Sequence, residues 1–179
     1  MKILAFAASN SARSINAHLL RHALTLVEGA EVEWLEIRDY EMPRYSPDRE
    51  EEGGVPEPAQ RFYQKIGEAD ALMISFAEHN GSYTAAFKNL YDWMSRIDMK
   101  VYQGKPVVML ATSPGGRGGA GVLATATSTA PHFGADVRGS LSVPRFQKSF
   151  DAEADRLVDD DLEAQLREVV SKLVDGGGA

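Results

Sequence analysis

The stretch AASNSARSIN at residues 7–16 concentrates side chains that could bind an anion, and it stands between an apolar run and an amphipathic segment. Its polar side chains are Ser9, Ser11, Arg13, Ser14 and Asn16. The free amides and the dipole of a helix N-terminus favour an anion by about 0.3–1 kcal/mol per charge in exposed settings. We therefore expect a phosphate here. The alternative is that Ser14 only caps the helix and that the other residues form an ordinary loop.

A second polar segment, AEHNGSYT, follows another apolar run. Glu78 could act as a general base, but no second carboxylate or nearby histidine pattern completes a dyad, and His79 alone could be structural. Asn80-Gly81 is a turn signal, and Ser82 or Thr84 could cap the helix that follows. No acid–base catalyst is expected here.

A third segment, TSPGGRGG, is rich in glycine. Residues 116–121 match G-x-G-x-x-G, but that fingerprint normally opens the first strand–helix unit, whereas this one follows the fourth strand. Glycine does let main-chain amides approach a flat ligand closely. Arg117 could meet a ligand charge or be solvated. His18 and His22 have the spacing of two metal ligands but no acidic partner in sequence, so no metal site is expected.

Short apolar runs alternate with segments of helical period along the chain. Strands are expected at 2–8, 31–37, 70–78, 105–113 and 135–143, and helices at 14–27, 58–69, 83–97, 119–131 and from 159 onward. Residues 38–57 are expected to form a long loop, residues 151–161 a solvated acidic linker and helix cap, and the final DGGGA a frayed end.

This alternation predicts an α/β fold with a doubly wound, five-stranded parallel sheet covered by helices on both faces. Residues 1–175 are expected to form one domain. In such sheets ligands bind beyond the carboxyl ends of the strands. The three polar segments follow the first, third and fourth strands, so we expect them to meet at one edge.

Composition excludes several function classes. The 179-residue chain has no cysteine, so thiol nucleophiles and disulfides are ruled out. Its formal net charge is −7 with no Lys/Arg cluster, so we expect no nucleic-acid partner. It has no apolar run of membrane-spanning length, so no membrane association is expected, and the lack of cysteine fits the cytoplasmic location that we expect. Residues 83–97 are apolar on more than one helical face. This predicts a homodimer or homotetramer, unless the chain itself covers both faces.

Taken together, the three segments resemble the NADPH-dependent FMN reductase family, a flavodoxin-like group that includes quinone, azo-dye and chromate reductases. Residues 8–16 occupy the register of the family's G-S-x-R-x-x-S-x-N loop, with Ala8 and Ser11 at its glycine and arginine positions. Residues 77–93 match P-E-Y-N-G-S-x-P-x-x-L-K-N-x-x-D-W, with Ala77 and His79 at its proline and tyrosine. Residues 104–119 match a G-K-P strand that ends in S-x-G-x-x-G-G. The similarity covers about residues 1–145.

The resemblance implies a flavodoxin-like FMN-binding domain and assigns roles to its residues. The phosphate would be held by Ser9, Ser11, Ser14 and Asn16 within the segment that also contains Arg13 and Ile15. The ribityl chain and flavin ring would lie beside Glu78, His79, Asn80, Gly81 and Ser82. The opposite edge of the ring would be lined by Ser113, Pro114, Gly115 and Gly116.

The activity implied by the resemblance is an FMN-dependent NAD(P)H oxidoreductase. A hydride would pass from NADPH or NADH to FMN and then to a small acceptor such as a quinone, an azo compound, a metal oxyanion or free flavin, with no catalytic side chain required. Two alternatives stay open, namely a flavodoxin-like electron carrier and a non-catalytic flavin-binding module.

Overall fold

The computed structural model describes residues 1–174, and the terminal DGGGA lies outside the described residues. Five strands form one sheet in the order β2-β1-β3-β4-β5, and every neighbouring pair is parallel. The strands are β1 (Lys2–Ala8), β2 (Glu31–Glu36), β3 (Ala71–Phe76), β4 (Pro106–Thr112) and β5 (Asp136–Val143). The predicted doubly wound, flavodoxin-like sheet is thereby confirmed.

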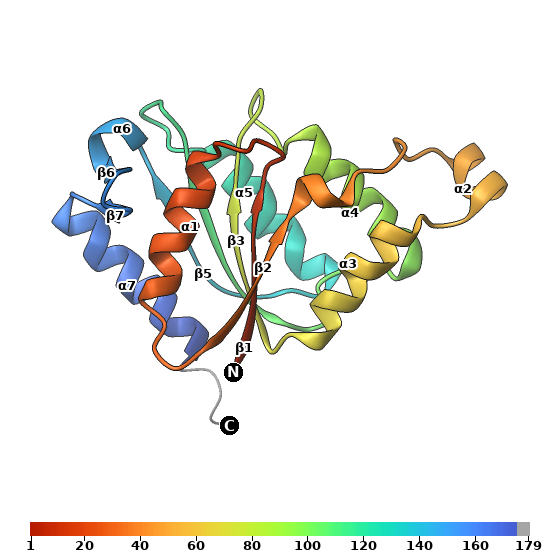
Figure 1. Ribbon diagram of the computed structural model, residues 1–179, viewed down its shortest axis with the longest axis horizontal. Coiled ribbons are helices and arrows are strands. Elements are labelled where there is room, and N and C mark those ends of the chain that lie inside the picture. The colour runs from red at the N-terminus through yellow and green to blue at the C-terminus, as the bar shows by residue number, and fades with distance from the viewer. Residues whose placement is uncertain (175–179) are drawn as a thin grey trace.

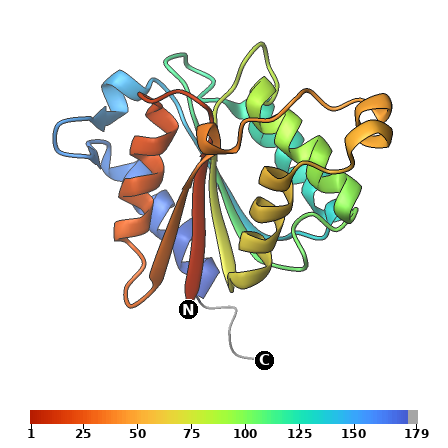
Figure 2. The same ribbon diagram turned by 45° about the vertical axis from the view of Figure 1, so that its right-hand side comes forward.

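Helices cover both faces of this sheet (Figures 1 and 2). One face carries α1 (Ile15–Thr25) and α7 (Asp160–Val174), and the other carries α3 (Glu57–Glu68), α4 (Ala85–Ile97) and α5 (Ala120–Thr129). Because neither face meets water, every residue of β3 is buried, which explains why this strand is apolar except for Ser75. Among residues 1–174, no helix has both the length and the apolarity needed to cross a membrane.

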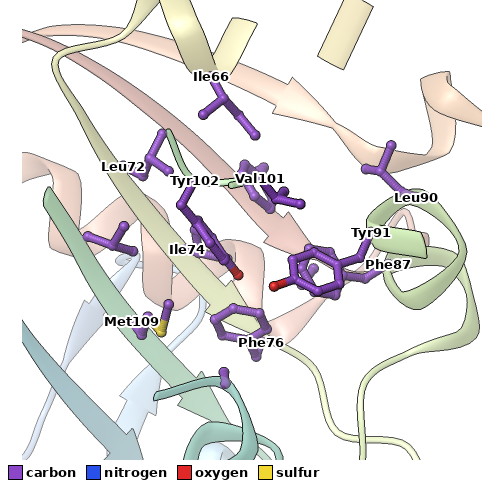
Figure 3. Packing of buried hydrophobic residues seen from close by; sticks show 14 of the residues in the cluster. Ile66, Leu72, Ile74, Phe76, Phe87, Leu90, Tyr91, Val101, Tyr102 and Met109 are labelled. Carbon is purple, nitrogen blue, oxygen red and sulfur yellow. The ribbon is translucent and has the colours of Figure 1, made fainter. Parts of the chain in front are cut away.

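The core beneath α3, α4 and α5 is rich in aromatic side chains (Figure 3). Phe87 packs edge-on against Phe76, with ring centroids 5.4 Å apart. The hydroxyls of Tyr91 and Tyr102 point toward each other within this apolar layer (Figure 3). Burial raises the pKa of both tyrosines, so both remain protonated at neutral pH.

Residues 38–57 are not the structureless loop that we expected. A 3-10 turn (Ile37–Tyr40) comes first, and α2 (Pro47–Gly53) then stands out from the body of the molecule (Figure 1). The Oγ atom of Ser46 accepts a hydrogen bond from the main-chain N–H of Arg49 at 3.2 Å, and Pro47 occupies the first helical position. A serine cap followed by proline is a helix-start signal that the sequence prediction missed. We call residues 41–56 the arm.

The arm is held by a stripe of side chains along α4. The side chain of Asn89 accepts a hydrogen bond from Tyr45 N at 2.8 Å and donates to the carbonyls of Met42 and Pro43 at 3.3 and 3.2 Å. The indole Nε1 of Trp93 donates to the Pro43 carbonyl at 2.7 Å. Asn89 and Trp93, one turn apart on α4, therefore bind the same segment of the arm.

The arm overturns the premise of the oligomer prediction. We expected one apolar face of α4 to be exposed, yet Leu90, Trp93 and Met94 are each 1% exposed. The face of α4 that remains open is polar, and Lys88 Nζ pairs with Asp92 Oδ1 there at 2.6 Å. The chain itself covers these apolar side chains, while Ile97 at the end of α4 is 38% exposed. The homodimer or homotetramer thus stays a prediction without this support.

The acidic segment after β5 has more structure than a linker. A short helix, α6 (Phe146–Ser149), precedes residues 151–161, and these residues take part in a hairpin of β6 (Phe150–Asp151) and β7 (Arg156–Leu157). His18 Nδ1 lies 2.6 Å from Asp155 Oδ1, and His22 Nε2 lies 2.6 Å from Glu163 Oε2. The i, i+4 histidine pair therefore joins α1 to two separate carboxylates.

An ionic cluster lies on the sheet near the amino ends of its strands. The Glu33 carboxylate on β2 meets Lys2 Nζ at 2.7 Å and Lys65 Nζ at 2.7 Å. Hydrogen bonds from Lys2 and then from Lys65 lower the pKa of Glu33 below the ordinary glutamate range. The cluster ties β1, β2 and α3 together, at the edge of the sheet remote from the three polar loops.

Candidate active site

The three polar segments lie at the carboxyl edge of the sheet, as predicted, and all three loops meet at the upper edge of Figure 1. Loop 1 (residues 9–14) follows β1, loop 2 (residues 77–84) follows β3, and loop 3 (residues 113–119) follows β4. Because β1, β3 and β4 are adjacent in the sheet, their carboxyl ends place the loops side by side.

Loop 1 is organised by its own serines. Ser9 Oγ accepts a hydrogen bond from Ser11 N at 3.2 Å, Ser11 Oγ accepts from Arg13 N at 3.3 Å, and Ser14 Oγ accepts from Ala17 N at 3.4 Å. Each serine oxygen therefore acts as an acceptor. A hydroxyl also has one hydrogen to donate, and among residues 1–174 none of these three serines donates to a protein group. The loop therefore leaves three O–H donors for a ligand.

Loop 1 leads directly into the N-terminus of α1. Ser14 is the N-cap residue, so the prediction of a cap is confirmed. The main-chain N–H groups of Ile15 and Asn16 are in the first turn, where a helix offers no acceptor. A capping serine and an anion site are compatible, because the cap occupies only one of the free amides.

Asn16 has a structural role that the sequence did not reveal. Its side chain is 2% exposed and joins α1 to two strands. Oδ1 accepts hydrogen bonds from Ser75 Oγ at 2.8 Å and from Thr112 N at 3.0 Å, while Nδ2 donates to the Thr112 carbonyl at 3.2 Å. The Asn16 side chain keeps one Nδ2 hydrogen for a ligand, besides the main-chain N–H of this residue, and the assignment of Asn16 to the phosphate stays a prediction.

Loop 2 is a tight reversal. His79 and Ser82 exchange main-chain hydrogen bonds, with N–O distances of 3.0 and 3.1 Å. Between them Asn80 and Gly81 have φ angles of 53° and 77°. Positive φ at both central residues defines a type I′ turn, for which Asn-Gly is the preferred sequence. The turn signal in the sequence therefore gave the correct local structure.

Side chains at the two ends of loop 2 fix it to its neighbours. Thr84, rather than Ser82, caps α4: its Oγ1 accepts from Phe87 N at 3.2 Å and donates to the Ala8 carbonyl at 3.1 Å. Glu78 Oε1 accepts from Val122 N at 2.8 Å at the start of α5. Glu78 thus acts as a helix cap, which accounts for a carboxylate here without a general base.

Loop 3 needs glycine for packing. Gly118 has a φ of 58°, and a Cβ there would lie 2.6 Å from Ser142 Oγ and 2.7 Å from the Val143 carbonyl carbon. Loop 3 is also paired with the chain after β5, because Arg145 N donates to the Gly115 carbonyl at 2.9 Å and Phe146 N donates to the Ser113 carbonyl at 3.1 Å. At Gly118 glycine thus permits contact with this chain segment rather than with a ligand, which corrects the sequence argument.

A cavity of about 210 Å³ opens between the three loops. It is lined by Ser9, Ser11, Arg13, Ser14, Ile15, Asn16, Ala77, Glu78, His79, Thr112, Ser113 and Pro114. Most of the predicted residues therefore come together on its wall. Five do not line it, namely Asn80, Gly81, Ser82, Gly115 and Gly116. Ala77 and Thr112 also line it; both open polar segments singled out in the sequence, but neither had been assigned to the site.

A second cavity lies on the other side of loop 1. It has a volume of about 250 Å³ and is lined by Asn10, by Arg44 and other residues of the arm and the 3-10 turn, and by the first turns of α4. Asn10 lines this cavity, whereas Ser9 and Ser11 line the first. Loop 1 thus separates the two cavities. The second cavity exists only because the arm forms part of its wall, so the sequence did not predict it.

Comparison with known proteins identifies relatives over nearly the whole chain. Residues 1–148 match the family model described as NADPH-dependent FMN reductase. The chain is 30% identical over 180 residues to an NADPH:quinone oxidoreductase of Arabidopsis thaliana, covering 97% of this chain and 90% of that one. It is also 30% identical over 178 residues to an NAD(P)H-dependent FMN reductase of Pseudomonas aeruginosa, covering 97% and 93%.

Two solved structures of reductases superpose on nearly the whole chain. FerB, a flavoenzyme NAD(P)H:(acceptor) oxidoreductase from Paracoccus denitrificans, superposes with a TM-score of 0.76 at 27% identity, covering 97% of this chain and 95% of that one. The azoreductase AzrA superposes with a TM-score of 0.67 at 16% identity, over 97% and 100% of the two chains, which shows a shared fold.

Proposed function

Because the chain belongs to the NADPH-dependent FMN reductase family, an enzyme family that uses FMN and NAD(P)H, we propose that it binds FMN at the three-loop cavity and reduces a quinone-type acceptor. Loop 1 would hold the phosphate, and residues of loops 2 and 3 would line the flavin ring. The observation that carries this proposal is the set of three serine hydroxyls in loop 1 whose hydrogens have no acceptor within residues 1–174.

The chemistry of loop 1 fits a phosphate monoester. Ser9 and Ser14 are 7% and 9% exposed, so their free O–H groups are held in fixed positions beside the cavity. Arg13 is exposed and lines the same wall, where it supplies a cation. Neutral donors with a single cation suit a dianion without placing large uncompensated charge in the empty site. A site for a neutral metabolite would not need this pattern.

The protein contributes position and donors rather than acid–base chemistry. FMN, when bound, supplies the hydride chemistry. Glu78 is occupied by the α5 N-terminus, so the cavity has no free dyad of carboxylates. Glu78 bonds loop 2 to the start of α5, Thr84 bonds it to the end of β1, and Asn16 bonds α1 to the end of β4, so the elements around the cavity are tied together without a ligand. In a flavin enzyme the protein contributes mainly by holding the cofactor and its hydrogen-bond donors in fixed positions.

A quinone is the acceptor that the relatives favour, because the Arabidopsis relative is an NADPH:quinone oxidoreductase. The second cavity beside loop 1 offers apolar walls from Ile37, Tyr40 and Met42. Planar carbonyl compounds suit such surroundings, since they combine apolar faces with two hydrogen-bond acceptors.

Anaerobic spectroscopy tests the proposal. The protein is loaded with FMN, mixed with NADPH or NADH without oxygen, and followed by the flavin absorbance; 1,4-benzoquinone is then added. We expect bleaching by the nucleotide and recovery of the colour with the quinone. Colour that nucleotides do not bleach would identify an electron carrier or a binding module instead, and no FMN binding at all would refute the assignment of the cavity.

Arg13 provides a clean variant for the phosphate end. Arg13→Ala should weaken FMN binding by about tenfold, as expected for a lost charge-assisted hydrogen bond of about 1.4 kcal/mol. Arg21→Ala is the matched control, because it removes the same charge from a later turn of α1, over Trp34 and away from the cavity. Equal FMN affinities in the two variants would contradict the position of the phosphate.

A further inference from the structure

Arg145, which sequence reasoning did not single out, has an unusual backbone. Its φ and ψ angles are 49° and 56°, in the left-handed region that residues other than glycine seldom adopt. Its N–H is bonded to the Gly115 carbonyl at 2.9 Å, so the residue is fixed directly against loop 3. A non-glycine residue held in this conformation is a feature that often accompanies a binding role.

The side chain of Arg145 lies along loop 3. Its Nη2, Nε and Cζ atoms are 3.7, 3.8 and 4.0 Å from the point that a Cβ on Gly116 would occupy. The guanidinium group is therefore placed against the main chain of the loop rather than extended freely into solvent. Because Gly116 has no side chain, the cation can lie beside the segment that the family resemblance puts at the edge of the flavin ring.

The positive charge at this rim is not neutralised. Arg117 directly follows Gly116, and both Arg117 and Arg145 are exposed. Within residues 1–174, neither forms an ion pair with a carboxylate. Although the chain as a whole has a formal net charge of −7, these two cations lie on neighbouring segments without a carboxylate partner among the described residues. Guanidinium groups are the preferred partners of phosphate because their donors match its oxygens in pairs.

We propose that Arg145, together with Arg117, recognises a phosphate group of the nicotinamide dinucleotide that reduces the flavin. This proposal rests on the proposed function. The FMN phosphate is assigned to loop 1, so the cations on loop 3 serve another anion. The dinucleotide must bring its nicotinamide to the exposed ring, and it carries a pyrophosphate, with an additional 2′-phosphate in NADPH. Both are phosphate groups, and the experiment separates them.

The test uses the FMN-loaded protein and the variants Arg145→Gln and Arg117→Gln. Lys148→Gln is the matched control, because Lys148 is an exposed cation on α6, three residues beyond Arg145. Titration calorimetry measures binding of two probes that cannot donate hydride: 2′,5′-ADP, which carries the 2′-phosphate, and ADP-ribose, which carries the pyrophosphate. Steady-state kinetics give KM and kcat for NADPH and NADH.

We expect Arg145→Gln to raise KM for NADPH about tenfold or more, with kcat and the Kd for FMN within about twofold of wild type. Arg117→Gln should act in the same direction, and Lys148→Gln should have no effect. If the 2′-phosphate is bound, 2′,5′-ADP binding weakens and KM for NADH is unchanged. If the pyrophosphate is bound, ADP-ribose binding weakens and KM for NADH rises by a similar factor.

Three results would overturn the proposal. One is unchanged probe binding and KM in Arg145→Gln, and another is loss of FMN from that variant, which would assign Arg145 to the flavin. The third is absence of binding of either probe to the wild-type protein. If the wild-type flavin is bleached by neither nucleotide, the proposed function fails, and the probe titrations still decide whether Arg145 binds phosphate.

Discussion

Asn16→Ala is the substitution that best tests how the three loops are held together. The Asn16 side chain makes three hydrogen bonds, one to Ser75 and two to the main chain of Thr112, and all are buried. Alanine removes every one of them. It also leaves the N–H and carbonyl groups of Thr112, a residue that is 1% exposed, without a side-chain partner.

The expected loss of stability follows from these contacts. An intramolecular hydrogen bond contributes about 0.5–1.5 kcal/mol net, and an abandoned buried polar group costs about 1–3 kcal/mol. We therefore expect Asn16→Ala to lower the free energy of unfolding by about 3 kcal/mol. For a chain of this size, that corresponds to a decrease in Tm of about 6–12 °C. Ser75→Ala removes only one of the three hydrogen bonds, so about 1 kcal/mol is expected.

The measurement is urea denaturation of the FMN-free protein, followed by circular dichroism. Omitting FMN matters because ligand binding would add its own stabilisation. Asn10→Ala is the control: Asn10 is an exposed asparagine in the same loop, so its loss should change stability by less than about 0.5 kcal/mol. An Asn16→Ala apoprotein as stable as the Asn10→Ala protein would refute the argument and would leave FMN binding as the purpose of Asn16.

Three further substitutions test other contacts. Gly121→Ala should lower the free energy of unfolding by about 1–2 kcal/mol in urea denaturation, since its Cβ would lie 2.5 Å from Oε1 of Glu78 and displace the α5 cap; an unchanged midpoint would disprove that packing. Hydrogen bonds from Lys2 and Lys65 lower the pKa of Glu33. The ionised Glu33 therefore adds its full contribution to the folding free energy above the ordinary carboxyl pKa, and this contribution is lost as the pH falls through the lowered pKa. The stability difference between wild type and Glu33→Gln should therefore shrink between about pH 7 and pH 3, and a constant difference would contradict the ion pairs. Asn89→Ala removes three hydrogen bonds to the arm and should speed limited proteolysis of the arm severalfold, whereas the control Lys88→Ala, on the exposed face of α4, should not; equal rates would show that Asn89 does not hold the arm.

The sequence determined the elements and most of the wall of the cavity. Strands buried on both faces must be mostly apolar, which is why β3 and β4 can be recognised as short apolar runs. Polar residues that follow such strands must lie at the carboxyl edge, so loops 1, 2 and 3 were found by their composition. The Asn80-Gly81 pair correctly predicted a turn, because the conformation of a turn depends mainly on its own residues.

The tertiary structure decided everything that depends on partners distant in the chain. Asn16 and Thr112 are separated by 96 positions, and no pattern near either residue indicates their pairing. Position 118 must be glycine because a Cβ there would collide with Ser142. Trp93 of α4 is bonded to the arm, a segment whose sequence predicts a loop. Arg145 became a candidate binding residue only because the structure shows its main chain bonded to loop 3. Periodicity and local signals are properties of neighbours in sequence, whereas a hydrogen bond or a steric contact depends on which segments the folded sheet brings together.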